Sequence, residues 1–340
     1  MGRGTTADVT APRPAPTLAG WLTLGLAALS IGALMVGPYG LTPGEVVAAL
    51  VGRGDPQAAV VVWNIRLPRV GAALLVGAAL AAAGASYQAL FRNPLVSPDI
   101  LGVSAGAGLG AVAGIFLSLP VAAIQLSAFA GGMAAVAVVA FVASLVRNTD
   151  RTLTLVLIGV VIGALAGAAT SLLKVMADPY DQLPAITFWL LGSLAAVTSG
   201  DILPALPAVA AGLVPLALLR WRINVLSLGD EEASALGVEA ARTRFLVIVA
   251  ATLITASVTA LAGVVGWVGL VIPHIARMLV GPGFGRLLPA SALIGAGYLL
   301  VVDTLARTMA QIEVPLGILT AVIGAPFFVW LLARGRRGWS

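Results

Sequence analysis

Residues 220–244 read RWRINVLSLGDEEASALGVEAARTR and form a polar island in an otherwise apolar chain. Arginines stand at both ends of this island and four carboxylates lie between them, so the island cannot lie in the hydrocarbon of a bilayer. Gly229 precedes three acids that favour the first turn of a short helix, and Gly237 ends that helix. The sequence therefore predicts a short helix, a glycine break and a second short helix on a folded surface outside the membrane.

The composition of the whole chain indicates an integral membrane protein. Of 340 residues, 60% are hydrophobic and only 10% are charged, and the mean hydropathy is +1.05. Such a chain cannot cover itself with a water-soluble surface, so most of its exterior must face lipid. The net charge of +5 comes from arginines clustered in short loops, where they report orientation in the membrane. We therefore expect an all-α membrane protein that does not bind nucleic acid.

Several classes of chemistry are excluded by missing residue types. The chain has no cysteine and a single histidine, His274, so disulfides, thiolate sites and paired-histidine sites for zinc or haem cannot form. His274 alone is expected to be a packing residue. The single lysine, Lys174, stands outside any GxxxxGK[ST] motif, so a phosphate-binding loop is absent from the sequence. We predict no catalytic, metal or cofactor site, and any ATP must be bound by another subunit.

Apolar runs of about 20 residues, the length needed to cross a bilayer, recur along the chain. A disordered cytoplasmic tail is expected over residues 1–17, an interfacial helix from Thr42 to near Gly52, and a second cytoplasmic tail over residues 334–340. The segment 184–197 is short and begins with a proline, so we expect it to lie at the outer face. The predicted crossings are 18–37, 68–90, 96–118, 121–146, 152–174, 202–219, 245–265, 267–280, 287–309 and 315–333.

The positions of the basic residues support ten crossings over eleven. With the N-terminus inside and ten crossings, 14 of the 19 basic residues lie on the inner side and 5 on the outer side. If 184–197 also crossed, the inner count would fall to 6, against the positive-inside tendency. We therefore predict that both termini and the polar island are cytoplasmic.

A short internal repeat fits this topology. Leu-Val-x-Pro-x-Ile occurs at 95–100 and again at 270–275, and its proline stands 29 residues after Arg69 in the first copy and after Arg244 in the second. Five predicted crossings separate the two copies, so they would run in opposite directions through the membrane. This is the inverted-repeat plan common among transporters.

Several long ordered motifs stand out along the chain: Arg66-Leu-Pro-Arg69, the run from Tyr87 to Gly106, Phe188 to Ser193, Leu226 to Glu232, Gly266 to Arg277, and Glu313 to Ile318. Through these motifs the sequence resembles the FecCD-type permeases over residues 18 to 333. Members of that family are the membrane subunits of binding-protein-dependent ABC importers for ferric siderophores, haem and cobalamin.

The resemblance implies a type II ABC importer permease fold in the inner membrane. A single transmembrane permease domain (18–333) would pair with a second permease copy, identical or a sister chain, above a cytoplasmic dimer of ABC ATPase subunits. The protein itself would not be an enzyme. In the family, the loop matching 220–244 couples to the ATPase, which here implies a coupling role for Gly229, Asp230, Glu231, Glu232, Ala233, Leu236 and Gly237.

On the outer face, the resemblance implies that Arg66, Arg69 and Arg307 receive acidic residues of a periplasmic substrate-binding protein. Guanidinium groups suit paired contacts with carboxylates. Two other interpretations stay open: the arginines could anchor phosphate headgroups, or Arg307 could pair with Asp303 four residues earlier on one helix.

The substrate is less clearly indicated by the sequence. Ser97-Pro98-Asp99-Ile100 and the segment 178–184 look closest to the corresponding segments of ferric-siderophore permeases, but permeases for haem, cobalamin and oxyanions have the same overall motifs. Two other classes of protein remain as alternatives. A secondary transporter would need membrane-embedded carboxylates, for which only Asp99 and Asp303 are candidates. An intramembrane enzyme would need a nucleophile or a metal motif, which the sequence lacks.

Overall fold

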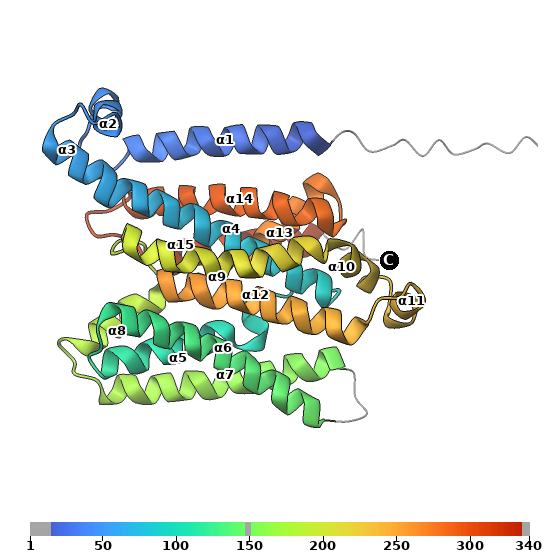
Figure 1. Ribbon diagram of the computed structural model, residues 1–340. Helices are drawn as coiled ribbons and strands as arrows, with labels where there is room; N and C mark the ends of the chain where they lie inside the picture. The colour runs from blue at the N-terminus through green and yellow to red at the C-terminus, as the bar shows by residue number, and fades with distance from the viewer. Residues whose placement is uncertain (1–14, 147–150, 335–340) are drawn as a thin grey trace, which may run out of the picture.

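The computed structural model describes residues 15–146 and 151–334, and every regular element within those ranges is a helix. Figure 1 shows the long helices lying side by side, which gives a bundle with two distinct ends. Most of the two predicted tails, residues 1–17 and 334–340, lies outside the described residues. The first helix begins at Ala15, inside the first predicted tail.

The helices are, in chain order, α1 (Ala15–Met35), α2 (Pro43–Leu50), α3 (Pro56–Val60), the π-helix η1 (Val61–Arg66), α4 (Leu67–Leu90), the 3₁₀-helix η2 (Pro98–Leu101), α5 (Val103–Phe116), α6 (Val121–Leu145), α7 (Arg151–Met176), α8 (Gln182–Leu191), α9 (Ser199–Leu218), α10 (Arg220–Leu226), α11 (Asp230–Ala235), α12 (Ala240–Ala262), α13 (Val268–Val280), α14 (Phe284–Ala306) and α15 (Leu316–Arg334).

Seven helices of the described part are long and apolar enough to cross a membrane, and four further apolar helices have 10–17 residues. The all-helical membrane class is therefore confirmed. Three of the predicted crossings, over α5, α13 and α15, fall among the shorter helices, so the count of ten stays a prediction.

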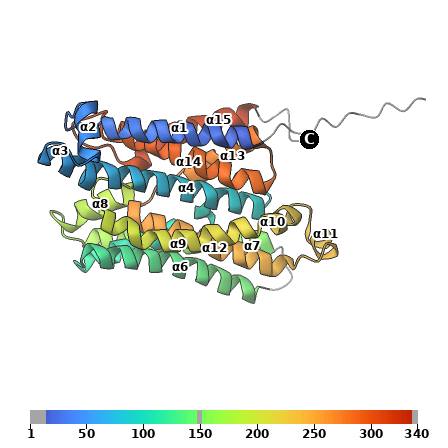
Figure 2. The same cartoon turned by 45° about the horizontal axis from the view of Figure 1, so that its top comes forward.

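The short helices gather at the two ends of the bundle. Helices α2, α3 and α8 lie at one end, and α10 and α11 lie at the other, as both views show (Figures 1 and 2). Helix α2 begins where the sequence predicts, because Thr42 and Glu45 form a reciprocal capping box. Helix α8 covers most of the segment expected at the outer face and ends at Gly192, whose φ is +74°.

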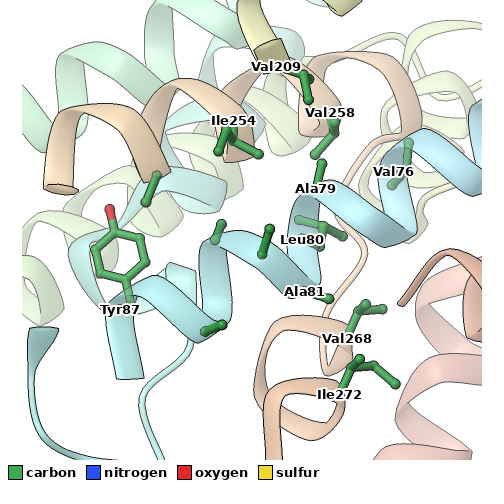
Figure 3. Close-up of a cluster of buried hydrophobic side chains, with 14 of the residues drawn as sticks. Val76, Ala79, Leu80, Ala81, Tyr87, Val209, Ile254, Val258, Val268 and Ile272 are labelled. Carbon is green, nitrogen blue, oxygen red and sulfur yellow. The ribbon is translucent and has the colours of Figure 1, made fainter. Parts of the chain in front are cut away.

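Helices α4 and α12 form the centre of the bundle and are the most buried of the long helices. Figure 3 shows how Val76, Leu80 and their neighbours on α4 meet apolar side chains of α12 and α13. Glycine allows this close approach: a Cβ on Gly84 would lie 1.9 Å from the carbonyl oxygen of Gly269, and one on Gly77 would lie 2.2 Å from that of Gly295. Helix α4 is therefore packed backbone against backbone on α13 and α14.

The polar island folds somewhat differently from the prediction. The short helix between Gly229 and Gly237 exists as α11, and Gly237 has the positive φ of +76° that ends it. The second short helix expected after Gly237 is wrong, because α12 begins at Ala240 and continues without a break into the apolar span. No proline or glycine lies between Glu239 and that span to stop the helix. A second short helix, α10, instead precedes α11.

Candidate coupling and docking sites

Asp230, the first residue of α11, joins this helix to both central helices. Its carboxylate accepts hydrogen bonds from both terminal nitrogens of Arg244 on α12, at 2.7 and 2.5 Å. Arg92, two residues beyond the end of α4, donates a third bond at 3.3 Å. The hydrogen bond from Arg244 is the main cause of a lowered pKa for Asp230, so this group stays a carboxylate at neutral pH.

The remainder of α11 presents one face to the protein and one to the outside. Ala233 is fully buried, while Leu236 is 53% exposed and Glu231 and Glu232 are also exposed. Gly229 is required here because its φ is +145°, a backbone conformation that other residues rarely adopt. The result is a short, well-anchored helix whose acidic and apolar residues are available to a partner.

Helix α10 is fixed to the bundle separately from α11. The side-chain oxygen of Asn224 accepts a hydrogen bond of 2.8 Å from the backbone nitrogen of Phe284, at the start of α14. Ile223 and Leu226 are buried beside it. The two short helices of the island are therefore bound to three different long helices, α4, α12 and α14.

At the opposite end of the bundle, Arg69 binds two carboxylates. Its Nε donates to Asp303 at 2.8 and 3.1 Å, and its two terminal nitrogens donate to Glu313 at 2.9 and 2.8 Å. Asp303 is completely buried on α14, whereas Glu313 lies in the loop before α15 and keeps 24% of its side chain exposed. A buried, fully hydrogen-bonded arginine of this kind fixes the geometry of the segments that it joins.

The other two arginines lie in the same cluster and bind mainly backbone carbonyls. Arg66 donates to the carbonyl oxygens of Leu34, at 2.7 Å, and Tyr39. Arg307 donates to the carbonyl oxygen of Ala33 at 2.6 Å, and its Nε lies 3.8 Å from Asp303. These contacts tie the end of α1 to α4 and α14.

We call Arg66, Arg69, Arg307, Asp303 and Glu313 the outer cluster. All but Asp303 line a cavity of about 410 Å³, which is also bordered by Tyr39 and Gln311.

Glu313 connects the outer cluster to a junction of three chain segments. Its carboxylate accepts a 3.0 Å hydrogen bond from the hydroxyl of Ser193, just beyond α8. The backbone nitrogen of Ser193 donates to Ala262 at the end of α12, and the nitrogen of Leu316 donates to Gly192. The ends of α8 and α12 and the start of α15 are thus linked to Arg69 through one carboxylate.

The structure brings the three predicted docking arginines together but buries them, with 2%, 7% and 8% of their surfaces exposed for Arg66, Arg69 and Arg307. The alternative pairing of Arg307 with Asp303 is present in the geometry, whereas a docking role stays a prediction. Sequence reasoning missed Glu313, Ser193 and Arg92 as partners. One signal was available: Glu313 is the single acid that follows Asp303 in the sequence, and it precedes a predicted crossing.

Comparison with known proteins establishes the family. The model of the FecCD transport family matches residues 25–334, which is nearly the whole described chain. The chain belongs to the FecCD transport family. The resemblance found in the sequence motifs, to permease subunits of binding-protein-dependent ABC importers, is therefore confirmed.

Relatives with similar sequences are permeases for different substrates. The molybdate import permease MolB of Haemophilus influenzae is 39% identical over 333 residues, covering 96% of this chain and 98% of its own. The Fe(3+) dicitrate permease FecD of Escherichia coli is 43% identical over 280 residues, covering 81% and 86%. A solved metal-chelate type ABC transporter in an inward-facing conformation is similar with a TM-score of 0.86 and 39% identity, over 94% of this chain and 99% of that one.

Proposed function

We propose that this FecCD permease passes an iron chelate, a ferric siderophore, from a periplasmic binding protein to the cytoplasm, driven by separate ATPase subunits. The similarity of segments 97–100 and 178–184 to ferric-siderophore permeases supports an iron chelate, as does the 43% identity to a Fe(3+) dicitrate permease. Relatives of comparable identity carry other substrates, so the alternatives are haem, cobalamin or an oxyanion.

The proposed topology has ten crossings and an inverted repeat, with both termini in the cytoplasm. Arg69 and Arg244, which stand at equivalent places before the two copies of the repeat, contact segments at opposite ends of the bundle. The crossings would be the seven long helices together with α5, α13 and α15. The end that carries α10 and α11 would face the cytoplasm, and the end that carries the outer cluster would face the periplasm.

The observation that carries the coupling proposal is the position of Asp230. This residue begins α11 and is held by Arg244 of α12 and by Arg92 after α4, so it joins the exposed short helix to the two most buried long helices. A displacement of α11 by an ATPase subunit would therefore reach the centre of the bundle directly. Gly229 and Gly237 keep α11 short, and Leu236, Glu231 and Glu232 form the surface that the ATPase would contact.

Docking of a binding protein on Arg66, Arg69 and Arg307 remains part of the proposal, with one structural consequence. Because the three guanidinium groups are buried, an acidic side chain of the partner would have to enter the 410 Å³ cavity to reach them. Glu313 already occupies both terminal nitrogens of Arg69. Docking would therefore involve exchange of Glu313 for the carboxylate of the partner.

Reconstitution in lipid vesicles with the ATPase subunits and the binding protein tests this function. Uptake of a ferric siderophore should require ATP and the binding protein, and it should continue when a proton uncoupler is added. Loss of uptake with the uncoupler at constant ATP would instead favour an ion-coupled secondary transporter. Identification of the compound retained by the purified binding protein tests the substrate, and a bound haem, cobalamin or oxyanion would overturn the iron chelate.

Docking is tested by Arg53→Glu and Arg66→Glu/Arg69→Glu variants in the same vesicles. Arg53 is exposed in the loop between α2 and α3, at the same end of the bundle, so its charge reversal serves as the control. The double arginine variant should insert and should bind the binding protein more weakly than the control. Because Arg69 also holds Asp303 and Glu313, binding is compared on variants shown to be folded, and unchanged affinity would remove the docking role.

A further inference from the structure

An apolar groove runs between α6 and α12 at the end of the bundle that carries α11. It encloses about 240 Å³, and its floor is formed by the end of α4, at Leu90 and Phe91. Small side chains such as Ala137 and Ala140 of α6 leave the space open, and Phe245 and Val249 of α12 form the opposite wall. The lining is apolar except for Ser144 and Arg244 near one end and Thr252, whose hydroxyl is hydrogen-bonded to Tyr87, at the other.

The groove has the length of one membrane leaflet. Its lining residues extend from Met133 to Ser144 on α6 and from Ala241 to Thr252 on α12, which is eleven residue steps along each helix. At a rise of about 1.5 Å per residue this distance is about 16 Å. Half of a hydrocarbon core of about 30 Å is about 15 Å. The groove therefore extends from the α11 end of the bundle to about the middle of the bilayer.

The medium outside the groove is hydrocarbon. Phe245 and Val249, which line the groove on α12, have 59% and 39% of their surfaces exposed, and both α6 and α12 are long and apolar enough to cross the membrane. An empty apolar groove would lose dispersion contacts along its whole length. An acyl chain from the surrounding leaflet matches the groove in chemistry and in length.

Arg244 provides the polar end of the groove. Its two terminal nitrogens bind Asp230, but its Nε is buried and has no hydrogen-bond partner within residues 15–146 and 151–334. Arg92 binds the same carboxylate, so two guanidinium groups share one acid and these three groups together carry a charge of +1. A phosphate monoanion complements both that charge and the free donor.

We propose that the groove binds one anionic glycerophospholipid, with an acyl chain between α6 and α12 and the phosphate beside Arg244. The bound lipid would lie next to the contact between Arg244 and Asp230, so its headgroup would stabilise the arrangement that joins α11 to α12. The proposal does not depend on which compound the permease transports.

Lipid retention by the purified permease tests the proposal. Native mass spectrometry should show one phosphatidylglycerol retained per permease chain, and phosphatidylcholine should not replace it in a titration. Ala140→Phe fills the groove and should weaken lipid retention by about tenfold. A tenfold change corresponds to about 1.4 kcal/mol in the free energy of lipid binding. Val138→Phe, on a neighbouring position with 44% exposure outside the groove lining, is the matched control and should retain the lipid.

A second experiment applies even if Ala140→Phe fails to fold. The chain has no cysteine, so Ala137→Cys carries a single thiol in the groove for a photoreactive label. Illumination in phosphatidylglycerol vesicles should link the label to lipid. Linkage to a second permease chain would overturn the proposal, as would equal lipid retention by Ala140→Phe and the unsubstituted protein. Equal binding of phosphatidylcholine and phosphatidylglycerol would overturn the role of the phosphate and Arg244.

Discussion

Replacement of Arg69 by methionine tests whether the outer cluster stabilises the bundle. Arg69→Met keeps a long apolar side chain but removes four hydrogen bonds to two carboxylates. Asp303 is left with no exposed surface, and removing one partner of a buried ion pair costs about 3–5 kcal/mol. We expect the lower end, about 3 kcal/mol, because Arg307 stays 3.8 Å from Asp303 and Glu313 can reach water.

A second substitution separates the buried charge from other effects of losing Arg69. In Arg69→Met/Asp303→Asn, the stranded carboxylate is neutral, so the double variant should be more stable than the sum of the single changes predicts. Arg66→Met is the matched control because Arg66 donates to backbone carbonyls. The changes in unfolding free energy caused by Arg66→Met and by Asp303→Asn should be additive within about 0.5 kcal/mol.

Unfolding by SDS in mixed micelles, followed with a fluorophore on one introduced cysteine, measures these free energies. The natural chain has no cysteine, so the label site is unique. A loss well below about 1 kcal/mol for Arg69→Met, the range of exposed ion pairs, would refute a stabilising role for the outer cluster. Strict additivity of Arg69→Met and Asp303→Asn would refute their direct coupling.

Three further predictions concern the centre and the α11 end. Gly84→Ala places a methyl group 1.9 Å from the Gly269 carbonyl oxygen and should destabilise the bundle by about 1–3 kcal/mol in the same SDS assay, whereas Gly25→Ala, with open space around it, should not. Thr252→Val removes the 2.9 Å partner of the buried Tyr87 hydroxyl and should cost about 1–3 kcal/mol, and Tyr87→Phe in the same chain should restore part of the loss. The pKa of Asp230 is lowered in the folded protein, so its contribution is complete above the ordinary aspartate pKa of about 3.9 and is lost as pH falls further. A spin label attached at Ser234→Cys should become more mobile below about pH 4. When Asp230→Asn is added to the labelled protein, the label should show that mobility already at pH 7. A label that is equally immobile with and without Asp230→Asn would contradict the role of Asp230.

Local features of the fold could be predicted from the sequence because they depend on neighbouring residues. The Thr42-Pro43-Gly44-Glu45 run predicts the start of α2 through its capping box, and Gly229 and Gly237 bound α11 as expected. Apolar length alone located the long helices. The start of α12 was misplaced because the charged residues Arg242 and Arg244 suggest a loop, although they continue the helix.

The pairing of Arg307 with Asp303 could be anticipated because the two residues are four apart on one helix, whereas the partners of Arg69 could not be predicted, because they are far away in the sequence. Arg69 and Glu313 are separated by 244 residues, and nothing in an apolar chain of this kind specifies which acid meets which arginine. The burial of Arg66 was also hidden, since its partners are backbone carbonyls, which every residue carries. The π-helix η1 that turns Arg66 inward has no sequence signal that we recognise.

Arg69 and Arg244 hold the two central helices at opposite ends, and the two contacts differ in strength. The contact of Arg69 is buried and includes two carboxylates, whereas Arg244 binds Asp230, whose side chain is 51% exposed. Exposed pairs contribute about 0–1 kcal/mol and buried ones cost several when broken. We therefore expect Arg244→Met to change the free energy of unfolding by less than about 1 kcal/mol while strongly reducing transport in vesicles. A large loss of stability would mean that the α11 end is as rigid as the outer cluster, and movement of α11 would then not pass through this contact.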